Sequence, residues 1–242
     1  MQLVANQQLV RNRVRLGVGF HLSALAVFAV GLFLSTTTDL TRELPIYSYG
    51  AILVGMMLYA LGQTQLRRWG PRNRQEEQLG KEIRGLDDRY KLYAFLSSSL
   101  PDYILVSPAG VHVLITRQED GQVTCIRDDW RQPSRSRWLS FLGGSRLGNP
   151  SADAQRRLQT LRRVLADEGL EGVPSGALIV FTNAKVQLRV EGCSTQVTRL
   201  EDLEDKLRRL AGKGQRVALT SARIRKVQAV FDKRMQAARA WR

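Results

Sequence analysis

Two long apolar runs lie in the first quarter of the chain, and polar or charged residues dominate most of the remaining three quarters. The first run, residues 16–35 (LGVGFHLSALAVFAVGLFLS), contains no charged residue. As a helix it would be about 30 Å long, which matches the hydrocarbon thickness of a bilayer. The second run, residues 46–66, has aromatic residues near its ends, where membrane interfaces favour them. This pattern predicts a transmembrane helical hairpin with spans at 16–35 and 46–66.

Arginine residues are concentrated at the outer ends of these two runs and are rare in the loop between them. They are numerous before the first run and after the second, whereas the connecting loop contains only Arg42. The flanking residues are Arg11, Arg13, Arg15, Arg67, Arg68, Arg72 and Arg74. Since Lys and Arg are retained on the cytoplasmic side, we expect a two-pass protein of the cell (inner) membrane with both termini in the cytoplasm.

The remainder of the chain alternates between strand-like and helix-like patterns. Two β-branched runs, 103–107 and 111–117, flank a Pro-Ala-Gly turn and predict a β-hairpin, and the apolar run 177–182 predicts a buried strand. Helical spacing begins after Asn149-Pro150 and recurs in 200–211. The order of elements predicts an α/β fold, a mixed sheet with flanking helices.

These patterns also set the domain boundaries. We expect a cytoplasmic N-terminal segment, a basic and polar linker after the second span, an α/β domain and a basic amphipathic C-terminal helix. Their limits are 1–15, 67–78, 79–219 and 220–242. The C-terminal helix could pack either on the domain or on the membrane surface.

The net charge narrows the classes of partner, and the cysteine pattern narrows the kinds of metal site and redox state to expect. The formal net charge of +15 favours anionic partners such as nucleic acid or anionic lipid headgroups. Cys125 and Cys193 lie in no CxxC or His-associated pattern, so no zinc site is indicated. We expect both to be reduced and structural in a cytoplasmic domain.

Several short motifs succeed one another between residues 80 and 183. They are Gly80-Lys81-Glu82, Asp102, the turn Ser107-Pro108-Ala109-Gly110-Val111, Gly121, Trp130, Asn149-Pro150 with Gln155, and ALIVFTN at 177–183. In order and spacing this series resembles the nuclease-related domain (NERD) family, over roughly half of the chain. The resemblance implies a restriction-endonuclease-like core, in which a helix Glu, a strand Asp and an acid-x-Lys pair gather at one edge of a sheet.

Carried onto this sequence, the resemblance implies a degenerate catalytic site. Glu82 matches the helix acid and Asp102 the strand acid, and these two would be the metal ligands if the protein is active. Carboxylates suit Mg²⁺, which would activate water for phosphodiester cleavage. The acid-x-Lys pair falls on Ile115-Thr116-Arg117, so an isoleucine stands where a ligand is required. We therefore expect no cofactor and no enzyme activity, or Mg²⁺ with Glu82, Asp102 and Arg117 as catalytic residues if cleavage persists with help from Glu119 or Asp120.

A basic segment, 127–146, interleaves arginine with aromatic residues. Its candidate binding residues are Arg127, Trp130, Arg131, Arg135, Arg137, Trp138 and Arg146. Such a segment can contact phosphates and stack on bases of DNA or RNA, or it can face anionic headgroups of membrane lipids. Three functions stay open: a catalytically degenerate binding module on the membrane, an active metal-dependent nuclease with a rearranged site, and a membrane scaffold that binds protein partners through the transmembrane hairpin or the C-terminal helix.

Overall fold

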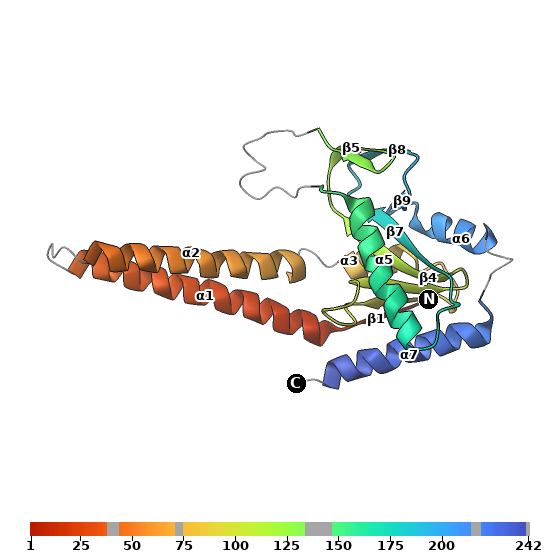
Figure 1. Ribbon diagram of the computed structural model, residues 1–242, viewed down its shortest axis with the longest axis horizontal. Helices are drawn as coiled ribbons and strands as arrows, with labels where there is room; N and C mark the ends of the chain where they lie inside the picture. The colour runs from red at the N-terminus through yellow and green to blue at the C-terminus, as the bar shows by residue number, and fades with distance from the viewer. Residues whose placement is uncertain (38–43, 71–74, 134–146, 214–218, 241–242) are drawn as a thin grey trace. The chain divides into compact units, whose positions relative to one another are not determined.

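The chain divides into two compact units, and the first six residues belong to the unit that contains most of the chain. The computed structural model describes residues 1–37, 44–70, 75–133, 147–213 and 219–240 (Figure 1). One unit is Gln7–Arg74, and the other combines Met1–Asn6 with Gln75–Arg242. The sequence pattern instead assigns residues 1–15 to one separate segment, so the N-terminal strand β1 (Gln2–Ala5) was not predicted.

The unit Gln7–Arg74 contains two helices, α1 (Gln7–Thr37) and α2 (Leu44–Trp69). They pack on each other through glycines: a side chain at Gly31 would meet Ala51, and one at Gly55 would meet the ring of Phe28. Small residues at such positions let apolar helices approach closely. His21, which lies in this contact, shares a hydrogen bond of 2.9 Å with the Gly17 carbonyl oxygen.

Apolar side chains cover the outer surfaces of both helices. The exposed residues include Leu22, Leu25, Leu32 and Phe33 of α1 and Leu53, Met56 and Met57 of α2. Within the described residues, only the α1 region Gln7–Thr36 is long and apolar enough to cross a membrane. The structure thus provides one candidate span in this unit, where the sequence pattern predicts two.

The α/β unit is built on a six-stranded mixed sheet with the order β1-β2-β3-β4-β7-β9 (Figure 1). The middle strands β2, β3 and β4 form an antiparallel meander, β7 and β9 continue it in parallel with β4, and β1 lies parallel to β2 at the edge. The bounds of the other five strands are β2 (Lys91–Ala94), β3 (Tyr103–Ser107), β4 (Gly110–Arg117), β7 (Ser175–Phe181) and β9 (Gln196–Arg199). The hairpin predicted at 103–117 is thereby confirmed.

A second sheet of three strands has the order β6-β5-β8. Its strands are β5 (Gly121–Ile126), β6 (Asp129–Arg131) and β8 (Val186–Glu191). In this sheet β5 pairs antiparallel with β6 and parallel with β8. The sequence pattern predicts β5 but neither of its partners, because β6 is very short and β8 carries charges along its exposed side.

Helices α5 (Pro150–Asp167) and α7 (Ser221–Ala240) share one core with one face of the large sheet. Asn149 caps α5 by accepting a hydrogen bond of 3.0 Å from the Ala152 N–H, and Pro150 occupies the first turn, as the sequence predicts. The apolar stripe of α7 is buried in this core: Ile224, Val227, Phe231 and Met235. The C-terminal helix therefore packs on the domain.

The opposite face of the large sheet is apolar as well. Leu92, Leu105 and Leu178, which alternate with the residues of the first face, are fully buried. Helices α3 (Gln75–Glu82) and α6 (Leu203–Lys213) contribute buried leucines, among them Leu79 and Leu207. The predicted α/β class, a mixed sheet with flanking helices, is confirmed.

Candidate functional site

The strand β3 places Asp102 beside the position where the resemblance requires an acid. In the β3–β4 ladder Tyr103 is paired with Leu114, so the preceding residue, Asp102, lies opposite Ile115. The Asp102 carbonyl oxygen accepts a hydrogen bond of 2.7 Å from the Phe95 N–H, which fixes the backbone at this point. Asp102 and the segment Ile115–Arg117 are therefore neighbours in the sheet.

Asp102 already has a cationic partner. The Arg157 guanidinium, on α5, lies 2.9 Å from an Asp102 carboxylate oxygen. Arg157 also lies 3.3 Å from Asp153, which in turn lies 3.3 Å from the Arg117 guanidinium. These four half-buried side chains form a chain of alternating charge: Arg117, Asp153, Arg157 and Asp102. We call this set the ion-pair cluster.

Arg157 keeps its charge in the ion-pair cluster. Burial disfavours the charged form of Arg157, but the carboxylates of Asp102 and Asp153 outweigh that effect and hold the pKa of its guanidinium above the usual range. A guanidinium that stays protonated offers only donors, so it cannot serve as a general base or as a metal ligand. It does neutralise the carboxylates that contact it.

Glu82 lies apart from this cluster. It is the last residue of α3 and half-buried, and its carboxylate makes no hydrogen bond or ion pair with the rest of the described chain. A different acid of the same helix, Glu76, is buried beside Tyr103 of β3. Burial raises the pKa of the Tyr103 hydroxyl, and the charges of Glu76 and Asp102 raise it further. Helical spacing from Leu79 and Ile83, which are both buried, could have identified Glu76 as the inward-facing acid.

Ile115 and Arg117 differ in environment. Ile115 is 5% exposed and belongs to the core between the large sheet and α5. Arg117 directs its guanidinium to Asp153. Glu119 is buried shortly after β4, whereas Asp120 is exposed. Within the described residues, none of these acids joins Asp102 or Glu82 in a group of three that could hold one metal ion.

The basic segment is described only in its first part. Arg135, Arg137, Trp138 and Arg146 lie outside the described residues, whereas Arg127, Trp130 and Arg131 are described. Arg131 is exposed and paired with Asp129 at 2.7 Å. Trp130 is half-buried: its Nε1–H donates a hydrogen bond of 2.9 Å to Ser151 Oγ, and its ring lies 6.1 Å from that of Phe181. Trp130 thus has an anchoring role at the start of α5.

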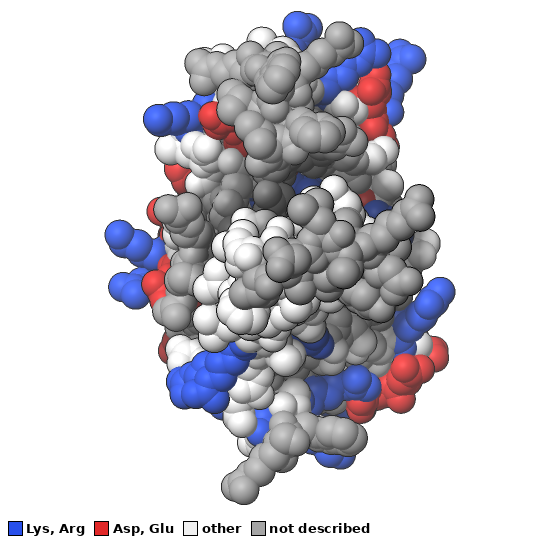
Figure 2. Space-filling view, turned by 90° about the vertical axis from the view of Figure 1, so that its left-hand side faces the viewer, with Lys and Arg blue, Asp and Glu red and all other residues white. Residues whose placement is uncertain are grey.

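The basic residues of the described part do not form one continuous surface in the view that Figure 2 gives. Lys and Arg side chains lie there in several separate groups, with Asp and Glu beside some of them. The described Lys and Arg side chains visible in this view therefore favour general attraction of anions and do not by themselves define a single binding face.

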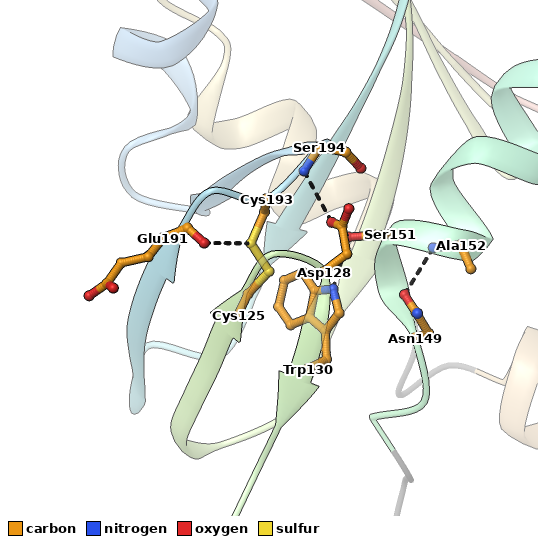
Figure 3. The surroundings of a disulfide bond; sticks show 9 residues. All are labelled: Cys125, Asp128, Trp130, Asn149, Ser151, Ala152, Glu191, Cys193 and Ser194. Carbon is orange, nitrogen blue, oxygen red and sulfur yellow. Dashed lines mark hydrogen bonds between the residues drawn. A yellow bond between two sulfur atoms is a disulfide. The ribbon is translucent and has the colours of Figure 1, made fainter.

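Cys125 and Cys193 form a disulfide, which corrects the expectation that both are reduced (Figure 3). Cys125 lies in β5, opposite Val190 of β8, and the chain turns back after β8 at Gly192, whose φ is +65°. This turn brings Cys193 to the neighbouring strand, with a Cα–Cα distance of 6.5 Å. Because the two cysteines are 68 residues apart in the sequence, local patterns could not predict this pairing.

Asp128 lies beside this disulfide in a strained turn. Arg127 and Asp128 connect β5 and β6, and both have positive φ, 49° and 66°. The Asp128 carboxylate accepts a hydrogen bond of 2.6 Å from Ser151 Oγ–H and one of 3.1 Å from the Ser194 N–H. These hydrogen bonds lower the pKa of Asp128 below its usual value. Figure 3 shows the carboxylate between the disulfide and the first turn of α5.

One side-chain group in the described residues has metal-ligand character: Cys125, Asp128 and Cys193, whose ligand atoms lie within 4.8 Å of one another. The fold and these sites define an α/β protein with an N-terminal apolar helix. No protein-family model, curated protein or solved structure matches this chain.

Proposed function

We propose that this chain is a membrane-anchored protein of the nuclease-related class. Its domain has exchanged its catalytic metal for an arginine, and its basic side chains attract phosphate-bearing polyanions in the cytoplasm. The proposed loss of catalysis rests on the Asp102–Arg157 ion pair. The proposed membrane anchoring rests on how the chain connects the two units.

Chain connectivity supports two membrane crossings. Met1–Asn6 and Gln75–Arg242 form one unit, because β1 is paired with β2. A single crossing in Gln7–Arg74 would separate these two parts on opposite sides of the membrane. If α1 spans the bilayer, the chain must return across it, and α2, with its exposed Leu53 and Met57, is the segment available.

Arginine distribution supports a cytoplasmic domain. Arg11, Arg13 and Arg15 lie at the end of α1 that joins the α/β unit, whereas the loop between the helices contains a single arginine, Arg42. Positive residues are retained on the cytoplasmic side. The disulfide would be unusual there, since stable disulfides belong to oxidising compartments. The side of the membrane on which the domain lies is therefore the first property to measure.

An epitope tag placed in the segment 38–43, compared with a tag after Arg242, tests the orientation. We expect the first tag to be accessible to antibody on intact cells (spheroplasts for an inner membrane) and the second only after permeabilisation. The reverse pattern would place the domain outside and remove the cytoplasmic assignment. Tags accessible on opposite sides would contradict the two crossings.

The ion-pair cluster supports a loss of catalysis. Asp102 lies at the start of a strand, next to the position of the acid-x-Lys pair, as the resemblance requires. In place of the second acid the chain has Ile115, and the cation that Asp102 contacts is the Arg157 guanidinium. A guanidinium has no exchangeable water to activate, so this site neutralises charge without supplying a nucleophile.

A cleavage assay tests this loss. Wild-type chain in detergent micelles is incubated with DNA and RNA, single- and double-stranded, in Mg²⁺ or Mn²⁺. We expect no cleavage above that given by the Asp102→Ala variant. Cleavage by the wild type that Asp102→Ala abolishes would identify an active nuclease and overturn the proposal.

Binding to polyanions is tested with the same preparations. The chain reconstituted in neutral lipid is offered DNA or RNA in one arm and anionic vesicles in the other. We expect binding in at least one arm that weakens steeply with salt, because phosphate contacts release counterions. Absence of binding in both arms at low salt would favour a scaffold that binds protein partners.

A further inference from the structure

We propose that Cys125, Cys193 and Asp128 form a binding site for one thiophilic divalent cation, such as Zn²⁺, when the disulfide is reduced. This site is separate from the ion-pair cluster, and neither its chemistry nor its test depends on the catalytic state of the domain. The sequence contains no hint of it, since its ligands do not have the spacing of known zinc motifs.

The three ligands come from different parts of the small sheet. Cys125 lies in β5, Asp128 in the β5–β6 turn, and Cys193 comes after β8. Their sulfur and oxygen atoms already lie within 4.8 Å of one another. In a tetrahedral zinc site with bonds of about 2.3 Å to sulfur and about 2.0 Å to oxygen, ligand atoms lie roughly 3.3–4 Å apart. Once the S–S bond is broken, the sulfurs move apart toward that spacing without any rearrangement of the strands.

The Asp128 carboxylate is oriented as a metal-bound carboxylate is. Two of its hydrogen bonds, from Ser151 Oγ–H and from the Ser194 N–H, fall on Oδ1. The Ser194 side chain is a further hydrogen-bond partner of the carboxylate. The Ser151 hydroxyl is itself held by the Trp130 Nε1–H. Outer hydrogen bonds of this kind orient a ligand carboxylate toward the metal.

Electrostatics distinguishes a metal site from a purely structural disulfide. A disulfide is neutral and gains nothing from an adjacent carboxylate. After reduction, two thiolates beside Asp128 would concentrate negative charge, which only a cation relieves. Cys193 and Asp128 are half-exposed, whereas Cys125 is fully buried, so a cation can enter from the Cys193 side. Three protein ligands leave a fourth position for water or another ligand.

Reduction and metal binding balance in electrons and protons. A dithiol or phosphine reductant supplies two electrons and is itself oxidised, and two protons convert the disulfide into two thiols. The cation then binds two thiolates and the carboxylate, and two thiol protons are released to solvent. A disulfide oxidant reverses the sequence: it accepts two electrons from the two thiolates and is reduced to two thiols, the S–S bond forms again and the cation leaves.

The test is metal binding by the full chain in detergent micelles. The protein is reduced with a phosphine, freed of excess reductant without oxygen, and titrated with Co²⁺ and then Zn²⁺. We expect one equivalent of Co²⁺ to produce a thiolate-to-cobalt absorption band in the near ultraviolet with visible bands typical of tetrahedral Co²⁺. Zn²⁺ should bleach these bands at one equivalent. The oxidised protein should give no band.

Variants identify the ligands. Cys125→Ser and Cys193→Ser should each abolish the band, and Asp128→Asn should weaken Co²⁺ binding about tenfold or more. Asp129→Asn is the matched control: Asp129 is the next residue, but it is exposed and paired with Arg131, so binding should not change. Circular dichroism of the oxidised proteins verifies that Asp128→Asn and Asp129→Asn fold.

Two results would overturn the proposal. If reduced wild type gives no thiolate–cobalt band, the cysteine pair is a disulfide only. If Asp128→Asn binds Co²⁺ as tightly as Asp129→Asn does, the carboxylate is not a ligand and the three-ligand site is wrong.

Discussion

Two carboxylates of the α/β unit, Asp102 just before β3 and Asp128 just after β5, differ in what faces them. Asp102 contacts the guanidinium of Arg157, and the same arginine bridges to Asp153. Within the described residues, the hydrogen-bond partners of Asp128 are neutral groups of Ser151 and Ser194, and the carboxylate lies beside two sulfurs. The first carboxylate is neutralised by the chain, whereas the second keeps its charge available to a ligand. An acid therefore indicates a metal site only when the chain supplies no cation of its own.

The largest expected effect comes from removing the disulfide. The double variant Cys125→Ser/Cys193→Ser should lower the free energy of unfolding of the oxidised protein by about 2–4 kcal/mol, because the bond closes a long loop in the unfolded chain. Thermal denaturation in detergent, with and without reductant, measures it. Wild type should lose a similar amount on reduction, and Zn²⁺ should restore part of it to wild type only. An unchanged melting temperature in the double variant would contradict the prediction.

The second-largest expected loss of stability comes from breaking the ion-pair cluster. Arg157→Ala leaves Asp102 and Asp153 without their shared cation, and we expect a loss of about 2 kcal/mol, less than for a fully buried pair because the side chains are half-exposed. Arg156→Ala is the control: Arg156 is on the same helix and also lies near Asp153, but at 3.8 Å and with a side chain that is 77% exposed, so its loss should cost much less. Denaturant unfolding measures both. Equal stability of the two variants would mean that Arg157 does not neutralise the cluster.

A smaller effect is expected from acid. Burial lowers the pKa of His112 to about 4, so the folded state holds it neutral while the unfolded chain protonates it near pH 6.5. Stability is therefore full above pH 6.5, falls as the pH drops from 6.5 to 4, and stops falling below that range. Because the ring is half-buried, we expect a loss of about 1–2 kcal/mol by pH 4. His112→Gln should show a smaller loss over this range; an identical pH dependence would exclude His112 as the cause.

The smallest expected effect on stability comes from removing Arg131, at the exposed end of the small sheet. Arg131→Ala removes an exposed ion pair with Asp129 and should change stability by less than about 0.5 kcal/mol. If Arg131 takes part in binding polyanions, the same variant should weaken DNA or vesicle binding without changing the melting temperature. A large loss of stability would instead show that Arg131 supports the turn that holds Asp128.

Local signals in the sequence predicted local structure well. The turn at Pro108-Ala109-Gly110 identified the β3–β4 hairpin, and Asn149-Pro150 identified the start of α5. Contacts between distant residues left no such signal. Arg157 and Asp102 are 55 residues apart, and an arginine on a helix face predicts no particular partner. The two cysteines are separated by a whole βαβ connection, so neither their spacing nor their surroundings could reveal the bond.

Glu82 and Glu76 show how a resemblance and a physical pattern can select different residues. The resemblance selects Glu82 through the Gly80-Lys81-Glu82 motif. Helical spacing from the buried Leu79 and Ile83, three and seven residues further on, selects Glu76, which the structure places beside Tyr103. Spacing reports which side of a helix is buried, whereas a motif carried over from another family reports only a position.

Strand β1 has a consequence for how the protein is made. Leu3 is paired with Leu92, so β1 waits for a partner that is synthesised after both helices. Closing so long a loop costs entropy and slows folding, and until then β2 is an exposed edge open to pairing with other chains. If both helices cross a bilayer, as proposed above, their insertion brings the two ends of this loop back to one side and shortens that wait. Pairing of β1 with β2 would then follow membrane insertion and report that it had succeeded.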